Sequence, residues 1–178
     1  MNFFTKVKGT TQSPPRVGIS EVAWSWLGAF VGIALVGLLQ GMFLDEFGQG
    51  LLIGSFGATA VLVYGAIRSP LAQPRNVLGG HVISALIGVF SYQLVGDIVW
   101  LAAALAVSTA IAVMHMTKTL HPPGGATALI AVIGGEPVHK LSYFYAFVPV
   151  GLGAIILIIV AVFLNNFAKN RRYPEFWF

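Results

Sequence analysis

The sequence predicts an all-α membrane protein with six transmembrane segments, four long and two short. The chain has 178 residues, of which 57% are hydrophobic and only 9% are charged, whereas a soluble domain usually carries about 25% charged residues. Four apolar runs are long enough to cross about 30 Å of hydrocarbon as helices. Two shorter runs both contain Gly-Ala-Thr-Ala, at residues 57–60 and 125–128. Backbone broken by Gly or Pro is tolerated in hydrocarbon only against protein or an aqueous cavity.

The four long runs are bounded by turn or charge signals such as Asp45-Glu46 and Gly96-Asp97. In chain order they are Val22 to Leu44, Val77 to Val95, Ile98 to Met116 and Tyr143 to Leu164. The short runs are Leu51 to Ile67 and Pro122 to Gly134, and the second would be only about 20 Å long as a helix. Each short run either crosses the membrane or turns back within it.

The distribution of positive charge favours six crossings. Lysine and arginine are enriched in short cytoplasmic loops. With the N-terminus inside and six crossings, all of the 10 Lys and Arg residues except Lys140 face the cytoplasm. If the short runs are re-entrant, the cations that lie outside are Arg68, Arg75, Lys118 and Lys140. We therefore expect a cytoplasmic arm (1–21) and a cytoplasmic tail (167–178), and the Lys-bearing arm suits a bacterial inner membrane.

The two halves of the chain, residues 22–95 and 98–166, have the same order of segments: long, short and broken, long. Three crossings per half is an odd number, so the second half enters the membrane from the opposite face. This order predicts a 3+3 inverted repeat. The two short segments would then meet near the middle of the membrane.

A polar site is expected between these two segments. Glycines precede both helical runs, so the first-turn N–H groups are expected to lack carbonyl partners. With the helix dipole, such groups form an anion site without a buried cation. The alternative is that the glycines only pack and the threonine hydroxyls bond back to their own helix. The predicted substrate-binding residues are Ser55, Gly57, Ala58, Thr59, Asn76, His81, His121, Gly124, Gly125, Ala126 and Thr127.

Three further residues are expected to attract anions at the cytoplasmic mouth: Arg75, Lys118 and His115. The two cations can equally be ordinary orientation charges. His121 is a candidate pH-sensitive gate or proton carrier, or it caps a carbonyl and holds the Pro-Pro turn. The sequence does not separate passive from proton-coupled movement.

Small residues recur four apart, at Gly28/Gly32, Gly37/Gly41 and Gly80/Ser84/Gly88. This spacing permits close helix packing, within one subunit or in a homo-oligomer. The stripes and the small size also fit another function class, a non-catalytic membrane scaffold.

The enzyme-class alternative is a b-type haem electron carrier, with His81 and His115 as ligands. We otherwise expect no enzyme, metal or cofactor. The chain has no cysteine, and it lacks both a Gly-x-Ser-x-Gly elbow and a His-Glu-x-x-His helix. The net charge of +4 does not indicate nucleic-acid binding, because the cations lie in loops and tails beside apolar spans.

Residues 121–128, HPPGGATA, resemble the signature of the HPP family of small integral membrane proteins. Arg75-Asn76, Gly79-Gly80-His81 and the segment 54–59, GSFGAT, are similar to other patterns of that family. The resemblance covers most of the chain, and members are usually described with four transmembrane helices. It implies transport of a small anion, nitrite in particular. The motif residues it singles out are His121, Gly124, Gly125 and Thr127, followed by Gly57, Thr59, Asn76 and His81.

Overall fold

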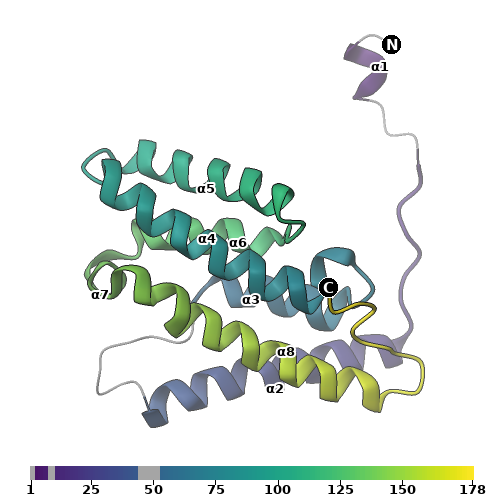
Figure 1. The fold of residues 1–178 in the computed structure, drawn as a ribbon. Helices are drawn as coiled ribbons and strands as arrows, with labels where there is room; N and C mark the ends of the chain where they lie inside the picture. The colour runs from purple at the N-terminus through teal and green to yellow at the C-terminus, as the bar shows by residue number, and fades with distance from the viewer. Residues whose placement is uncertain (1–2, 8–10, 44–52) are drawn as a thin grey trace.

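The computed structural model describes residues 3–7, 11–43 and 53–178, and every regular element within these ranges is helical. A short N-terminal turn, α1 (Phe3–Lys6), precedes the helical bundle (Figure 1). The predicted segment ends Leu44 and Leu51 lie outside the described residues. The all-α prediction is confirmed for the part of the chain that the structure describes.

Four helical stretches are long and apolar enough to cross a membrane, as predicted. Three are single helices: α2 (Ile19–Phe43), α4 (Pro74–Val95) and α5 (Val99–Met116). The fourth is the composite stretch Gly135–Phe167. The bounds of the three single helices lie within three residues of the predicted ones where both are described, because a continuous apolar run fixes the helix more strongly than local propensity does.

Lys118, one of the predicted entrance residues, has a backbone role in ending α5. Thr119 N donates to Met114 O at 2.9 Å and Lys118 N donates to His115 O at 3.2 Å, the pair of bonds that closes a helix in a Schellman motif. Lys118 has a φ of 57°, the left-handed conformation that glycine usually supplies at this position. The backbone of Lys118 therefore has a structural role of its own.

The last long span is not the uninterrupted helix expected for residues 143–164. It consists of α7 (Gly135–Leu141), the 3-10 turn η4 (Ser142–Ala146), the π-helical turn η5 (Phe147–Gly151) and α8 (Leu152–Phe167). Val148 has non-helical angles, φ −133° and ψ 119°. It precedes Pro149, and a proline disfavours helical geometry in the residue before it.

The two short apolar segments are also helical. α3 (Ser55–Ala60) continues into the π-helical turn η2 (Val61–Gly65), and α6 covers Pro122–Ile133. At 1.5 Å per residue, each is about 16–18 Å long, roughly half of the hydrocarbon thickness. The segment order long, short, long is found in both halves, but the composite last span has no counterpart in the first half, so the exact 3+3 repeat is not confirmed.

Several contacts place four parts of the chain at one end of the bundle. An ion pair of 2.6 Å joins Arg171, after α8, to Glu21, in the first turn of α2. Glu175 N donates to Gln73 Oε1 at 2.8 Å, which ties the tail to the turn η3 (Pro70–Ala72) and the start of α4. Arg75 donates to Thr117 O at 2.8 Å and adds the end of α5.

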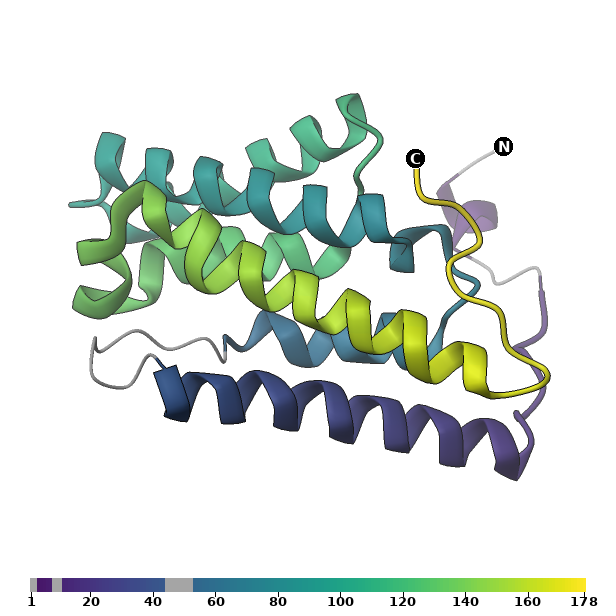
Figure 2. The ribbon, with the colours of Figure 1, turned by 60° about the horizontal axis from the view of Figure 1, so that its bottom comes forward.

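The α4–α5 connection and the start of the composite last span lie at the opposite end of the bundle. Gln93, near the end of α4, donates to Ser142 Oγ in η4 at 2.9 Å. Figures 1 and 2 show the same division, with α7 and the α4–α5 turn at one end and the C-terminus at the other.

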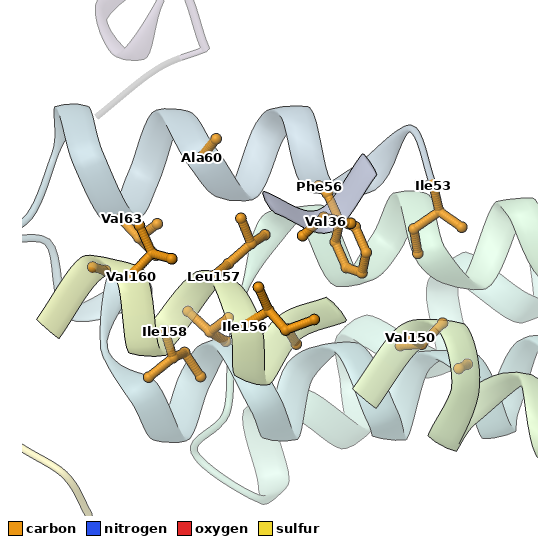
Figure 3. Close-up of a cluster of buried hydrophobic side chains, with 14 of the residues drawn as sticks. Val36, Ile53, Phe56, Ala60, Val63, Val150, Ile156, Leu157, Ile158 and Val160 are labelled. Atoms are coloured by element: carbon orange, nitrogen blue, oxygen red, sulfur yellow. The ribbon is translucent and has the colours of Figure 1, made fainter. Parts of the chain in front are cut away.

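The larger apolar core lies where α2, α3, η2, α4 and α8 meet, and Figure 3 shows its side chains from α3 facing those of α8. Tyr64, on η2, is fully buried and donates to Leu157 O at 3.1 Å. It packs against the Gly28/Gly32 stripe, since a Cβ on Gly32 would lie 2.2 Å from the Tyr64 hydroxyl oxygen. These stripe glycines therefore pack within the subunit.

A smaller core lies between α4, α5 and α6. The Gly80/Ser84/Gly88 stripe of α4 contributes to it, because a Cβ on Gly88 would lie 2.5 Å from Ala128 O of α6. This stripe also packs within the subunit, and α4 is the helix against which α5 and α6 are assembled.

Candidate functional site

Two buried histidines share one threonine hydroxyl inside the bundle. Thr59 Oγ1, on α3, lies 2.7 Å from His81 Nε2 and 3.1 Å from His121 Nε2. All three side chains are fully buried, and the two imidazole centroids are 4.9 Å apart. The sequence placed both histidines near a cytoplasmic mouth. The structure places them inside the protein, because α3 and α6 pack over them.

The second threonine of the repeated motif binds the other nitrogen of His81. Thr127 Oγ1, on α6, lies 2.7 Å from His81 Nδ1 and donates to Ser55 Oγ at 2.9 Å. The outer nitrogen of His121, Nδ1, lies 2.8 Å from Leu71 O. A carbonyl oxygen only accepts, so this nitrogen carries a hydrogen.

These contacts form one continuous path, which we call the hydroxyl–imidazole chain. Its members, in order, are Leu71 O, His121, Thr59, His81, Thr127 and Ser55. It joins α3, α4, α6 and the turn before α4.

The hydroxyl–imidazole chain also fixes how the two short helices cross. Ser55, which begins α3, lies beside Thr127, while Thr59, one turn later, lies beside His121, which precedes α6. The two helices are therefore antiparallel, and their N-terminal halves overlap. The prediction that the two Thr-bearing segments meet is confirmed.

The backbone amides do not provide the predicted free donors. Pro122 and Pro123 have no N–H, and Gly124 N donates to His121 O at 2.8 Å. At the start of α3, Phe56 N and Gly57 N donate to the carbonyls of residues 53 and 54 at 3.0 and 3.3 Å. The expectation of unpaired first-turn amides was wrong at these positions, since turns of the preceding chain supply carbonyl acceptors. The hydrogen-bond donors of the site belong to side chains.

The glycines of the two motifs divide into packing and open positions. A Cβ on Gly124 would lie 2.8 Å from both Gly80 O and Ser84 Oγ, so this glycine permits close contact between α6 and α4. A Cβ on Gly125 would meet only Val107, at 3.9 Å, and one on Gly57 would meet nothing within 4 Å.

Four predicted binding residues lie away from the hydroxyl–imidazole chain. Gly57 and Ala58 are exposed, and Gly125 and Ala126 are half-buried, on faces of α3 and α6 that point elsewhere. Helical geometry explains this, because residues one or two positions from a site residue do not share its face.

Two predicted residues instead hold the connection between α5 and α6. Arg75 donates to Thr117 O and Asn76 Nδ2 donates to Leu120 O at 2.9 Å. Asn76 Oδ1 is buried without a hydrogen-bond partner in the structure. His115 is exposed on α5, so it takes no part in the buried site.

This placement does not support the haem alternative. Both ring nitrogens of His81 have threonine partners, and its neighbouring imidazole is His121 rather than His115. Within the described residues, no group of three or more His, Cys, Asp or Glu side chains is arranged to hold a metal ion.

Sequence reasoning missed two features around the site. The first is the Leu71 carbonyl, which requires His121 to carry a hydrogen on Nδ1. It lies in a turn bracketed by Pro70 and Pro74, and these two prolines are the sequence feature that could have indicated the turn. The hydroxyl of Tyr145 approaches Thr127 O at 3.5 Å, and no spacing in the sequence indicated this.

Arg171 was expected only as an orientation charge, and the structure gives it a larger role. It is buried and donates to Glu21, Ser25 Oγ, Asn165 Oδ1 and Tyr64 O. It therefore anchors the tail to α2, η2 and α8.

A pocket of about 440 Å³ lies beside Arg171, and an apolar groove of about 1010 Å³ runs along α4 and α8. Both lie apart from the hydroxyl–imidazole chain.

Fold and site together define a multi-pass membrane protein, helical throughout its described elements, with one buried polar cluster between two short helices. Residues 14–174 match the model of the transmembrane region of the HPP family. The chain belongs to the HPP family, as its motifs indicated.

Two relatives are transmembrane proteins of Dictyostelium discoideum. One is 46% identical over 180 residues, covering 99% of this chain and 58% of the relative. The other is 42% identical over 182 residues, covering 99% and 64%. This chain thus spans about three fifths of the length of these relatives. They come from a eukaryote, so the expected bacterial inner membrane stays a prediction. No solved structure is significantly similar to this chain.

Proposed function

We propose that this chain is not an enzyme but a transporter that carries a small monovalent anion, with nitrite the first candidate. The observation that supports this most is the hydroxyl–imidazole chain between the overlapping starts of α3 and α6. Polar side chains inside a membrane bundle are costly, and they commonly mark substrate and ion paths. Nitrite as the ion comes from the family resemblance, and the residues themselves favour only the class of small anions.

The anion would bind by replacing bonds within the hydroxyl–imidazole chain. The hydroxyls of Ser55, Thr59 and Thr127 and the N–H groups of the two imidazoles are the donors that it would use. In the described residues, no hydrogen bond or ion pair joins a lysine or arginine to the hydroxyl–imidazole chain. Binding by dipoles alone is shallow, and transport needs a site that the ion can also leave.

The positions of the cations support six crossings, with both short helices contributing to the path. Four cations share one end of the bundle: Arg68 and Lys118 lie in connections, Arg75 in the first turn of α4 and Arg171 in the tail. Asp97 lies in the connection at the other end. A cytoplasmic location for the basic end agrees with the usual bias of membrane proteins.

Cysteine labelling tests this topology, because the chain has no cysteine of its own. Arg68 and Asp97 are exposed positions in connections, and single cysteines there report on opposite sides if six segments cross. We expect an impermeant maleimide added outside cells to label Asp97→Cys and to leave Arg68→Cys unlabelled. The reverse pattern would refute six crossings with the N-terminus inside.

Flux into liposomes tests the function directly. Purified protein should raise nitrite uptake above that of empty vesicles, and Thr127→Val should lower it at least tenfold while the protein remains folded. Thr117→Val is the matched control, because its hydroxyl is exposed and bonds back to Val113 O. Absence of flux for nitrite, nitrate, formate and chloride would refute transport and favour a membrane scaffold.

A further inference from the structure

We propose that the hydroxyl–imidazole chain binds one proton with each anion, so that the protein is an electroneutral proton–anion symporter. This inference rests on the anion transport proposed above and adds the coupling ion. It depends on a count of hydrogens along the hydroxyl–imidazole chain. It also depends on the finding that no other described residue supplies a balancing charge beside the two imidazoles.

The hydroxyl–imidazole chain has five contacts, and with both imidazoles neutral it has four hydrogens to fill them. Both of its ends accept: Leu71 O has no hydrogen to give, and Ser55 Oγ accepts from Thr127. The four groups between these ends are two imidazoles and two threonine hydroxyls. Each brings one hydrogen when neutral. The hydrogen of the Ser55 hydroxyl does not enter the count, because Ser55 Oγ is the acceptor in its contact with Thr127, so one contact lacks its hydrogen.

One added proton completes the hydroxyl–imidazole chain, with donation running outward from His121 to both of its ends. His121 then donates from both nitrogens, to Leu71 O and to Thr59 Oγ1. Thr59 donates to His81 Nε2, and His81 Nδ1 donates to Thr127. Every contact has its hydrogen, and the imidazole pair carries one positive charge.

The deprotonated chain also has an acceptable arrangement. Thr59 Oγ1 and Thr127 Oγ1 each lie 3.2 Å from a carbonyl oxygen one turn earlier in their own helices, those of Ser55 and Pro123. When the proton leaves, either hydroxyl can donate there instead. The threonines thus allow the same packing to exist with and without the proton.

Among the residues that the structure describes, no other group contacting the imidazoles can balance the charge of a bound anion. The ring of Phe56, on α3, packs edge-on against His81, and the nearest titratable side chain on η4 is Tyr145, whose hydroxyl approaches Thr127 O. Of the cations at the end of the bundle that holds Leu71, Arg75 binds a backbone carbonyl and Lys118 is exposed. In the described residues, no Asp, Glu, Lys or Arg pairs with either imidazole.

Charge balance then favours joint binding. A lone anion in this apolar bundle is costly, and so is a lone proton on a buried imidazole. Bound together, they leave the site neutral, so each increases the affinity of the other by the same factor. The proton comes from the side on which the anion enters, is held on an imidazole nitrogen, and leaves with the anion on the other side.

The experiment uses vesicles that contain the purified protein, with nitrate as the probe, since nitrate has no weak conjugate acid to leak through lipid. The membrane potential is held at zero with potassium and valinomycin. For one proton per anion, an outside pH lower by one unit should drive about tenfold accumulation of nitrate, because each factor of ten costs about 1.4 kcal/mol. An inside-positive potential without a pH gradient should drive none.

Nitrate flux that follows the potential and ignores the pH gradient would overturn the coupling and leave anion transport standing. Lack of flux for nitrate and for nitrite would overturn both proposals. His121→Gln should abolish accumulation driven by the pH gradient, and tenfold accumulation by this variant, folded as judged by gel filtration, would also refute the coupling. His115→Gln, at an exposed position on α5, is the matched control and should behave as the unmodified protein does.

Discussion

Thr59→Val removes the hydroxyl shared by the two buried imidazoles and keeps the side-chain volume nearly constant. Thr59 Oγ1 has contacts of 2.7 and 3.1 Å to the imidazole nitrogens. A side-chain hydrogen bond between membrane helices contributes about 0.6 kcal/mol on average and about 1.7 kcal/mol at most. The loss of two such bonds should therefore destabilise the protein by about 1–3 kcal/mol. Thr59→Ser keeps the hydroxyl and loses one methyl group, which costs about 1 kcal/mol.

The two variants separate the hydroxyl from the methyl group when stability and flux are measured together. Stability is measured by denaturant unfolding in mixed micelles, and flux by nitrite uptake into vesicles. We expect Thr59→Ser to retain flux within about threefold and Thr59→Val to lose at least tenfold, which corresponds to about 1.4 kcal/mol at the transport step. Unchanged stability together with unchanged flux in Thr59→Val would show that the hydroxyl–imidazole chain does not exist in the membrane.

The remaining predictions concern packing and the ends of the bundle, and thermal unfolding in detergent measures each. Gly124→Ala should destabilise the protein by about 1–3 kcal/mol through overpacking against α4. Gly125→Ala has only an ordinary contact at 3.9 Å, so it should be neutral or stabilise the protein by up to about 1 kcal/mol. Equal effects of the two substitutions would contradict the assigned helix faces. Lys118→Gly should stabilise by about 1 kcal/mol by relieving the positive φ, and destabilisation would argue against the Schellman end. Arg171→Met should cost about 3 kcal/mol because its buried partners lose their donor, while Arg172→Met, at an exposed position, should have no effect beyond about 0.5 kcal/mol.

The long helices were predictable because length and apolar character are local properties of the sequence. The interruption at Val148 was missed, although Pro149 was visible, because the surrounding residues are as apolar as those of a continuous span. The composite last span shows that hydropathy reports burial in lipid or protein and does not report helix continuity.

The candidate site was predicted in its residue types and only partly in its construction. The repeated motif pointed to Thr59 and Thr127, and the structure brings both to His81. The predicted backbone donors were wrong where the amides are described, since a sequence does not reveal which turn carbonyls come close enough to accept. Gly57 and Ala58 are adjacent in sequence to site residues but lie on another helix face.

The sequence alone determined the protein class, the long spans and the pair of short apolar segments that carry threonine, because these follow from composition and from spacing within one segment. Only the tertiary structure decided which polar groups meet. The partners in the five contacts of the hydroxyl–imidazole chain are 50, 62, 22, 46 and 72 residues apart in sequence. Helix packing selects them: an apolar surface lets many helix faces approach one another, and a buried hydroxyl or imidazole favours the arrangement in which its hydrogen bonds are satisfied.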